Sequence, residues 1–461
     1  FWLKLSKKLC VASSTWPCML SASLLRISLL LPIRQMGHAA EVKAAFRVKR
    51  LDSSGRLSRA EISTLLREGR PDFPERLLSG LLAHVGWGQD GKVSFDDFVD
   101  MVFQTGRKQE APKVLIVADP GPDPDDVKVL LVASTLQRRG EISICGVVAN
   151  GGHQAHQRAV LAKAILRAAG AGEVRVGVGS AGKFYEPKPH EYRFDGCANV
   201  REEDLEDGAA LIRNVLNEAA PRSIIVQCQS GLTDIADVMR EEKDLFLAKV
   251  AKVSVQGGLN PSDDPSKGAW VPDSSANNVF DMEAADFLYN FCIRHQMTMH
   301  VVHGNAVPPL PMTLARSFTQ KGCPAMEYLN DAQRMGLIGL WQNVCKGGIM
   351  PARCTKEWFF TTFCGVDAAT YAEKYRDLDI DCNIEEHLNG SVKPYDLIAF
   401  LSILPTWRST FPFERAKVNV NGGEHFFFLT KELALDSKVV FDFLSQIFAE
   451  VVEFHSSACR L

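Results

Sequence analysis

Short apolar runs alternate with longer amphipathic stretches beyond residue 112. The apolar runs predict strands at Val114–Ala118, Ile142–Ala149, Val174–Val178, Ser223–Cys228, Lys252–Gln256 and Thr298–Val302. Helical periodicity lies between them, at Val127–Arg138, Gln154–Ala169, Leu205–Ala219, Asp234–Glu241 and Met282–Arg294. Because continuous apolar strands alternate with helices, the pattern predicts an α/β fold with a mostly parallel, doubly wound sheet covered on both faces.

A different pattern occupies residues 41–105. The segment Asp52–Glu61 lies between two helical patterns, and its glycine, apolar residue, serine and terminal acid recur thirty-six residues later around Gly91. This repeat resembles a pair of EF-hands, whose loops turn at a glycine and pair through the apolar residues that follow. The resemblance implies a small all-α domain.

Calcium binding by this pair is a separate question. The first ligand position is Arg50 in one loop and Gly86 in the other, where an EF-hand has Asp, and Asp97 replaces the bidentate Glu at the end of the second loop. Since calcium affinity depends on the number and charge of the ligands, the loss favours a structural, metal-free pair.

The remaining boundaries come from composition. Residues 1–40 contain lysines, arginines and serines but no acidic residue, which resembles a signal or transit segment. The alternative is that translation begins at Met36 and that the preceding residues are an artefact or disordered. We expect a cytoplasmic protein, or organelle or secretory targeting if residues 1–35 are genuine. Polar residues 106–112 predict a linker, and residues 113–461 form the large domain.

Composition excludes some classes of protein. The 461 residues include 46% hydrophobic and 23% charged residues, as in ordinary globular proteins. A net charge of −3 gives no electrostatic reason to expect a nucleic-acid partner. The apolar stretch from Cys18 to Ile33 is interrupted by Arg26 and is too short to predict a membrane span. The 12 cysteines show no CxxC pair, which predicts free thiols.

The strongest chemical signal is an acidic turn after the first predicted strand. Asp119, Asp123, Asp125 and Asp126 place four carboxylates within eight residues. Like charges so close repel one another, which indicates a bound cation or a catalytic task. The alternative is a solvated acidic turn, since Asp, Pro and Gly are ordinary turn residues. Ligands bind outside the carboxyl ends of parallel strands, and this turn lies at such an end.

Other predicted strand ends carry polar residues in a specific order. Asn150 follows one strand, Gly231-Leu232-Thr233 follows another, and Asn277 and Tyr395-Asp396 come later in the chain. Each has an alternative interpretation as a helix cap or turn. Their joint order points to one composite site.

With these motifs, residues 113–420 resemble the inosine/uridine-preferring nucleoside hydrolases. The acidic turn fits the family form DxGxDxDD, the segment around Gly231 is similar to GPLTN, and Tyr395–Ala399 is similar to HDPLA. The resemblance implies a calcium-dependent enzyme that hydrolyses the N-glycosidic bond of ribonucleosides in purine or pyrimidine salvage, with a nucleoside as its small-molecule partner. Family members commonly form dimers or tetramers, so a homo-oligomer is expected.

The resemblance also assigns roles to individual residues. It implies that Asp119 is a calcium ligand and the base that activates a calcium-bound water. Asp126, the Thr233 backbone carbonyl and Asp396 would complete the protein ligands. The ribose would be held by Asp125, Asn150, Asn277 and Asp396, with Asp123 as an alternative to Asp125. Calcium suits such a site because it accepts six to eight oxygen ligands.

Two departures concern the nucleobase side. Tyr395 stands where many members have a His linked to leaving-group activation, and the pKa of tyrosine, near 10, makes it a poorer acid. Ser275 and Ala276 lie where a Glu is common. His153, His156, His190 and Tyr192 are further candidates for a base contact. The alternative function is therefore an inactive hydrolase-like domain that acts as a calcium-binding or scaffolding module.

Overall fold

In the computed structural model the chain divides into two compact units, with the division between Ala111 and Pro112. The described residues are 56–69, 91–95, 98, 111–121, 124–151, 153–181, 193–262, 270–319, 321–347, 352–404, 414–420, 423–431 and 436–458. Neither the predicted targeting segment nor the predicted linker core at 106–110 falls within them. No described helix has both the length and the apolar character that crossing a membrane requires.

The first unit contains a short antiparallel ribbon and a helix. Strands β1 (Arg56–Ser58) and β2 (Lys92–Ser94) pair with Leu57 opposite Val93, and helix α4 (Arg59–Gly69) follows β1. The pairing joins the two stretches that the sequence predicts to pair. The turns of the two predicted loops lie mostly outside the described residues, so the EF-hand pair stays a prediction.

Glu61 has a structural contact in this unit. Its Oε2 accepts hydrogen bonds from the Ser58 backbone N at 2.7 Å and from Ser58 Oγ at 2.6 Å, while Ser58 Oγ accepts from the Glu61 N at 3.3 Å. This reciprocal arrangement satisfies backbone donors at the start of α4. The predicted loop ligand thus also stabilises the helix that follows the ribbon.

The second unit is built on a nine-stranded sheet, as far as the chain is described. Eight strands are parallel, and β14 pairs antiparallel at one edge. In spatial order the strands are β14 (Glu414–Val420), β15 (Gly423–Thr430), β11 (Thr298–Val302), β8 (Val250–Gln256), β7 (Ile224–Cys228), β3 (Lys113–Ala118), β4 (Ser143–Ala149), β5 (Val176–Val178) and β6 (Leu205–Asp207). The predicted doubly wound, mostly parallel sheet is confirmed.

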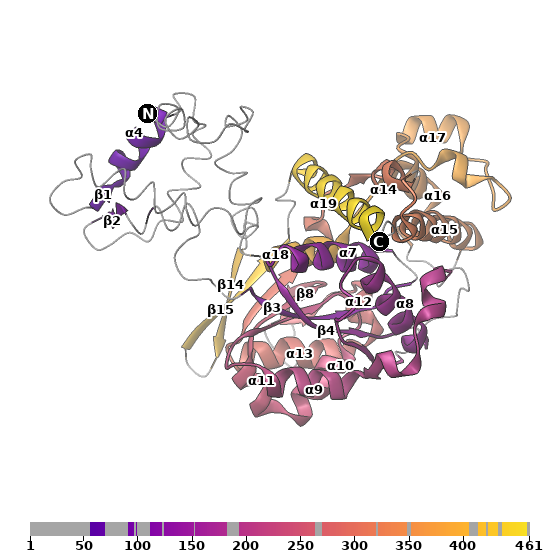
Figure 1. Ribbon diagram of the computed structural model, residues 1–461. Coiled ribbons are helices and arrows are strands. Elements are labelled where there is room, and N and C mark those ends of the chain that lie inside the picture. The colour runs from indigo at the N-terminus through magenta and orange to yellow at the C-terminus, as the bar shows by residue number, and fades with distance from the viewer. Residues whose placement is uncertain are drawn as a thin grey trace. The chain divides into compact units, whose positions relative to one another are not determined.

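Helices cover both faces of this sheet (Figure 1). One face carries α7 (Asp125–Arg138), α8 (Ala155–Ala168), α18 (Tyr395–Ser402) and α19 (Ser437–Ala458). The other carries α9 (Gly208–Glu218), α10 (Thr233–Glu241), α11 (Lys243–Lys249) and α13 (Met282–Arg294). In β3, Val114, Ile116 and Ala118 join the first core, while Leu115 and Val117 join the second. Burial on both faces explains why its apolar run is continuous.

Two predicted helices begin elsewhere than expected. Residues 205–207 form the edge strand β6, and helix α9 begins only at Gly208, where Asp207 accepts from the Ala210 N at 2.8 Å as the N-cap. The expectation of a helix from Leu205 is therefore wrong, because an edge position on the sheet and a capping aspartate displace its first turn. Helix α7 begins at Asp125, so two of the acidic residues belong to the helix.

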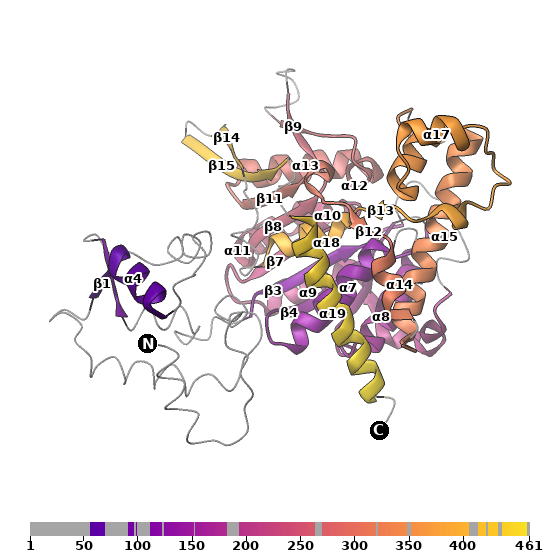
Figure 2. The same cartoon turned by 90° about the horizontal axis from the view of Figure 1, so that it is seen from above.

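A helical lobe is inserted between β11 and α18, seen at the upper right of Figure 1 and in Figure 2. A two-residue ribbon of β12 (Leu310–Pro311) and β13 (Ser391–Val392) brings its ends together. Its helical elements are α14 (Thr313–Thr319), α15 (Pro324–Lys346), α16 (Lys356–Phe359), the π-helical turn η7 (Phe360–Cys364), α17 (Ala368–Lys374) and the 3₁₀ turn η8 (Ile384–His387). A separate core around Trp341, Phe359 and Phe360 holds α15–η8 together.

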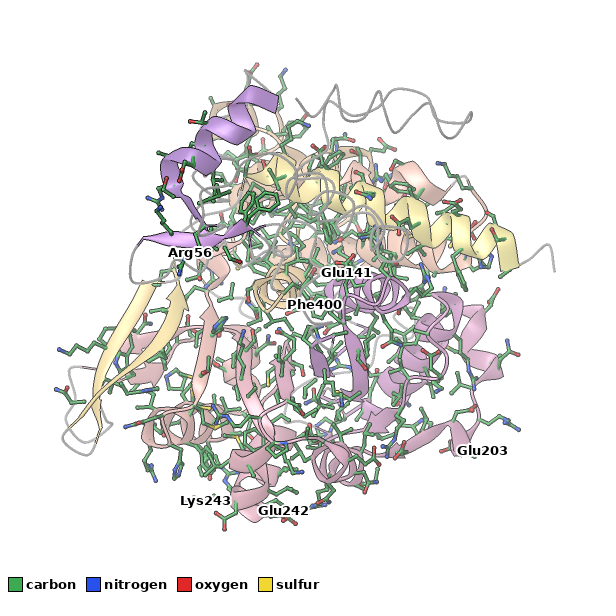
Figure 3. The ribbon with its side chains drawn as sticks, turned by 60° about the vertical axis from the view of Figure 1, so that its left-hand side comes forward. Arg56, Glu141, Glu203, Glu242, Lys243 and Phe400 are labelled. Carbon is green, nitrogen blue, oxygen red and sulfur yellow. The ribbon has the colours of Figure 1, made fainter. Side chains whose placement is uncertain are left out.

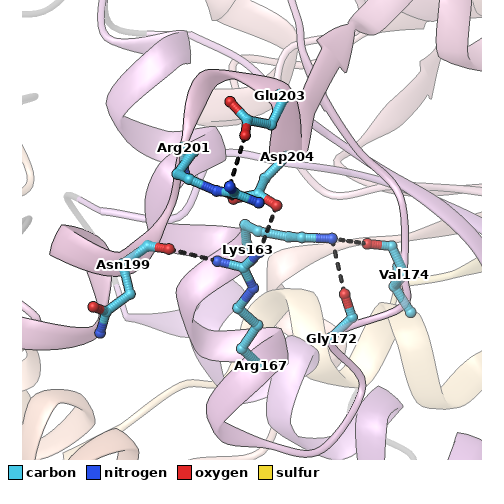
Figure 4. A network of polar contacts seen from close by, with 8 residues as sticks. All are labelled: Lys163, Arg167, Gly172, Val174, Asn199, Arg201, Glu203 and Asp204. Atoms are coloured by element: carbon cyan, nitrogen blue, oxygen red, sulfur yellow. Dashed lines mark hydrogen bonds and ion pairs between the residues drawn. The ribbon is translucent and has the colours of Figure 1, made fainter.

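A polar network fixes α8 against its surroundings (Figure 4). Lys163 Nζ donates to the carbonyls of Gly172 at 2.9 Å and Val174 at 2.8 Å, and Arg167 donates to Asp204 at 2.6 Å. Burial lowers the pKa of Lys163. The lysine bonds hold α8 against the turn that enters β5, and the arginine bond holds it against the segment that precedes β6.

We expect Phe400→Ala to lower the free energy of unfolding by about 3–5 kcal/mol, because removing the ring leaves a cavity where α18 packs into the core. Phe400 is fully buried and is labelled in Figure 3. Urea denaturation followed by circular dichroism measures the change. Phe400→Leu should cost less, and Val439→Ala, at a position 43% exposed on α19, should stay within about 0.5 kcal/mol of the unmodified protein. A loss for Phe400→Ala no larger than that of Val439→Ala would contradict the expectation.

Candidate functional site

Parallel strands end along one edge of the sheet, and the predicted site residues lie just beyond those ends. Asp119 follows β3, Asn150 follows β4, and Thr233 begins the helix after β7. Asn277 lies in α12 (Ala276–Phe280) beside the end of β8. Because the strands run in the same direction, residues distant in sequence meet at this edge.

The acidic turn folds back on itself. Asp126 Oδ1 accepts from the Asp119 backbone N at 3.2 Å and from Gln229 Nε2 at 2.9 Å. Asp125 and Asp126 are 3% and 2% exposed, so a solvated surface turn is excluded for these two residues. Asp123 lies outside the described residues, and its alternative role is not tested.

Burial sets the electrostatics of Asp126. Desolvation raises the pKa of its carboxyl well above the ordinary value, and the charges of Asp119 and Asp125 raise it further, against the hydrogen bond from Gln229. An ionised carboxylate is costly in such a place unless a positive charge compensates it. The site therefore has the electrostatic character of one that receives a cation.

Asp396 joins this cluster from the far end of the chain. Its backbone N donates to Asp125 Oδ2 at 3.0 Å across 271 residues of sequence. The amide belongs to the first turn of α18, where backbone N–H groups have no partner within the helix and favour a negative charge. The start of α18 is thus bound to the start of α7, which brings Asp396 to the acidic turn.

Lys128 compensates one of these carboxylates. Its Nζ lies 3.5 Å from Asp125 Oδ1 and 3.0 Å from Gln333 Oε1 of α15, and the residue is 7% exposed. The lysine therefore links the acidic turn to the helical lobe. A second buried cation, Arg158 of α8, lies 3.1 Å from Asp119 Oδ2 through its Nη1.

Asn150 is held by the neighbouring strand end. Its Nδ2 donates to the Gly231 carbonyl at 2.9 Å and to Asp234 Oδ2 at 2.7 Å. Asp234 stands at the position of the final Asn in the family segment GPLTN, so this chain adds a buried carboxylate there. Burial raises the pKa of Asp234, while the hydrogen bonds from Asn150 and Ser180 lower it.

The two adjacent asparagines of α12 have different surroundings. Asn278 donates to the carbonyl of Gly258 at 2.9 Å and accepts from the Tyr289 hydroxyl at 3.1 Å, so it serves the fold. Asn277 donates to Gln256 Oε1 at 2.7 Å at the end of β8. These contacts favour Asn277 as the residue that meets a ligand.

Thr233 and Tyr395 lie at other points of the same edge. The Thr233 hydroxyl donates to Asp281 Oδ2 at 2.9 Å. Tyr395 is the first residue of α18, is 37% exposed, and lies so close to Gly304 that a Cβ there would be 3.2 Å from its Cε1. The tyrosine is thus presented beyond the end of β11.

Within the described part of the chain, no three or more His, Cys, Asp or Glu side chains are already gathered as a metal site. The donor set is nevertheless the kind that calcium prefers, since Asp119, Asp126 and Asp396 offer carboxylate oxygens. Burial raises the pKa of Asp126, and the nearby charges of Asp119 and Asp125 raise it further. The residues therefore fit calcium by charge and donor chemistry.

Sequence reasoning missed four polar residues of this site: Lys128, Arg158, Gln229 and Asp234. Lys128 and Arg158 are charged positions within helices whose neighbours are buried, and such an interruption is a usable signal. Asp234 follows the Gly-Leu-Thr segment directly. Of the candidate histidines, His156 pairs with exposed Glu202 at 2.9 Å, and His190 lies outside the described residues.

Comparisons with solved structures match about three quarters of this chain. Two solved structures align with TM-scores of 0.60 over 75% of this chain: the type III effector protein XopQ complexed with adenosine diphosphate ribose, at 25% identity over 96% of that chain, and the effector protein XOO4466, at 23% over 95%. The purine-preferring ribonucleoside hydrolase of Gardnerella vaginalis aligns at 14% identity and a TM-score of 0.46, over 74% of this chain and 99% of that one. The comparison with curated proteins gave no match.

The family is shown by its own sequence profile. The profile of the inosine-uridine preferring nucleoside hydrolases matches residues 114–424, which is more than half of the chain. This span includes every predicted site residue, from the acidic turn to α18. The chain therefore belongs to the inosine-uridine preferring nucleoside hydrolase family.

Proposed function

We propose that this protein hydrolyses the N-glycosidic bond of a ribosyl compound, with Asp119 as the base that takes a proton from water. The observation that carries the proposal is the hydrogen-bonded convergence of Asp119, Asp125, Asp126 and Asp396 at the carboxyl edge of the sheet. Such bonds break with positive charge developing on the sugar ring, and nearby carboxylates stabilise that charge.

Each residue has a role in this proposal. Asp119 is partly exposed, at 15% of its side chain, so it can reach water and ligand. Asp125 binds a ribose hydroxyl, and Asn150 and Asn277 bind the sugar from the neighbouring strand ends. Tyr395, at the exposed start of α18, faces the leaving group.

Calcium is the cofactor that fits. Asp119, Asp126, Asp396 and the Thr233 carbonyl would hold it, and when bound it supplies a Lewis acid that lowers the pKa of water. Lys128 pairs with Asp125 and Arg158 pairs with Asp119, which leaves the charges of Asp126 and Asp396 for one divalent cation to balance. The charge balance supports the proposal without fixing a geometry.

Ribonucleosides are the first candidate substrates, because the chain belongs to their hydrolase family. Adenosine diphosphate ribose is a second candidate, since the effector XopQ has been solved with it. Both compounds carry a ribose joined to a base through nitrogen. A panel that includes both classes separates a nucleoside hydrolase from an enzyme for larger ribosyl ligands.

A second candidate function is ribosyl binding without turnover. It is favoured by Tyr395, which stands where many family members have a His and is a poorer acid. Binding of adenosine diphosphate ribose or a nucleoside with no base release, with calcium present, would support this function over hydrolysis.

We further propose that residues 41–105 form an EF-hand-like domain preceding the hydrolase domain at 113–461.

We expect Asp119→Asn to reduce base release by at least about 100-fold, since a general base contributes about 10²–10⁴. The amide keeps an oxygen for Arg158, so the variant should still fold. Chromatographic detection of free base gives the rate. Asp237→Asn, on the exposed side of α10, is the matched control and should keep full activity. Unchanged turnover in Asp119→Asn would rule out its role as the base.

Asp126→Asn should stabilise the calcium-free protein, on the order of 1 kcal/mol at neutral pH. The folded state raises the pKa of Asp126, so its ionisation costs stability above the unfolded pKa, and the gain should disappear below about pH 4. Thermal unfolding with a chelator measures this. Calcium at 100 times its Kd should add about 2.7 kcal/mol to the unmodified protein and nothing to the variant. Equal stabilisation of both proteins by calcium would exclude Asp126 as a ligand.

Tyr395→His should raise turnover of natural nucleosides by about 10–100-fold, because imidazole is a better acid than phenol near neutral pH. A p-nitrophenyl riboside, whose leaving group needs no proton, should be cleaved at a nearly unchanged rate. The ratio of the two rates isolates leaving-group activation. An equal effect on both substrates would show that Tyr395 does not face the leaving group.

A further inference from the structure

Two buried charged side chains outside the predicted site residues join four neighbouring strand ends. Arg158 of α8 is fully buried, and Asp234 of α10 is 8% exposed. Between them they contact residues that follow β3, β4 and β5, and Asp234 itself lies in the helix that follows β7. Burying a charge is costly unless it is paired and hydrogen-bonded, so both positions require explanation.

Arg158 connects the ends of β3 and β4. Its Nη1 donates to Asp119 Oδ2 at 3.1 Å and to the Asn150 carbonyl at 2.8 Å. A single guanidinium nitrogen thus bridges the proposed base and the backbone of a proposed sugar ligand. The rigid planar fork of arginine suits such a bridge better than the flexible stem of lysine.

The backbone around Asn150 is closed onto this guanidinium. Gly151 has φ of +82°, and a Cβ placed on it would lie 2.7 Å from Arg158 Nη1. Its N also donates to the Ser180 carbonyl at 2.8 Å. Only glycine combines this conformation with such a close approach. The turn and the arginine therefore form one packed unit.

Asp234 holds the side chain of Asn150. Asp234 Oδ2 accepts from Asn150 Nδ2 at 2.7 Å and from Ser180 Oγ at 3.0 Å, and its Oδ1 accepts from the Ser180 N at 2.7 Å. Asn150 Nδ2 also donates to the Gly231 carbonyl. Both amide hydrogens of Asn150 are consumed, and because both partners are acceptors, the amide has only one orientation.

The Oδ1 atom of the same amide is a buried acceptor. Asn150 is 1% exposed, and its Oδ1 makes no hydrogen bond to the described residues. A buried acceptor left without a donor costs about 1–3 kcal/mol. The backbone carbonyl of Asn150 and the carboxylate of Asp119 accept hydrogen bonds from the same Arg158 nitrogen. Asn150 Oδ1 therefore belongs to a residue of the candidate site.

We propose that Arg158 and Asp234 are positioning residues that hold Asp119 and Asn150 as one hydrogen-bonded unit, in which Asn150 presents only an acceptor to the ligand. The ligand must then supply a hydrogen, and a ribose hydroxyl is the group that does so. The identification of that hydroxyl as part of a ribosyl compound rests on the proposed function. The positioning itself rests on the contacts alone.

This arrangement has a specific chemical consequence. A ligand that lacks the hydroxyl, or carries a methyl ether in its place, leaves Asn150 Oδ1 buried without a donor. Sites built to hydrogen-bond a hydroxyl reject analogues that lack it strongly. Without Asp234 the amide keeps its bond to the Gly231 carbonyl but loses the second acceptor that fixes its orientation, so it can offer N–H to the ligand as well as oxygen.

The test measures binding of inosine, 2′-deoxyinosine, 3′-deoxyinosine and adenosine diphosphate ribose by calorimetry, with turnover assayed in parallel. We expect Asp234→Ala to weaken inosine binding about tenfold and to reduce discrimination against one deoxy analogue by a similar factor. Arg158→Met should lower kcat more than it raises KM, and Arg158→Lys should recover part of the loss. The control is Asp237→Ala, on the same helix as Asp234 but in an exposed contact with Arg240.

Crystal structures of Asp234→Ala and Arg158→Met make the result independent of turnover. The Asn150 amide should reorient in the first and the Asp119 carboxylate should shift in the second. Unchanged positions of both groups, or deoxy discrimination by Asp234→Ala equal to that of the unmodified protein, would overturn the inference. If the unmodified protein neither binds nor cleaves the probes, the proposed function fails, while the two structures still decide the positioning.

Discussion

The hydrogen bond from the Asp396 backbone N to Asp125 Oδ2 is the contact on which the site depends. It closes a loop of 271 residues and brings the starts of α7 and α18 together at the edge of the sheet. The donating amide belongs to the first turn of α18, and the N-terminus of a helix favours negative charge nearby. Without this contact Asp396 would not be held beside the acidic turn.

This closure creates an electrostatic demand that the fold meets only in part. Lys128 compensates Asp125 and Arg158 compensates Asp119, each from a helix packed on the same face of the sheet. Asp126 receives hydrogen bonds from Gln229 and a backbone amide, and its pKa stays raised. A divalent cation would relieve this imbalance, which supports the proposed calcium site.

The helical lobe is tied to the same centre. Its ends meet in the β12–β13 ribbon just before α18, and its helix α15 reaches Lys128 through Gln333. Lys128 also contacts Asp125, for which we propose a role in binding the sugar. A change in the position of the lobe would therefore alter the surroundings of that carboxylate. The helical lobe is therefore connected to the candidate site by a hydrogen bond through Lys128.

The sequence alone determined the sheet and one half of the site. Continuous apolar runs predict strands buried on both faces, and the acidic turn and Asn150 directly follow such runs. Asp396 was indicated by the resemblance of Tyr395–Ala399 to the family segment HDPLA. Contacts across the sheet were decided only by the tertiary structure. Burial of Arg158 and Asp234, the single orientation of the Asn150 amide, and the strand at 205–207 depend on neighbours far away in the chain. Local patterns carry no information about such neighbours, because hydrogen bonding and desolvation are set by the groups that folding brings together.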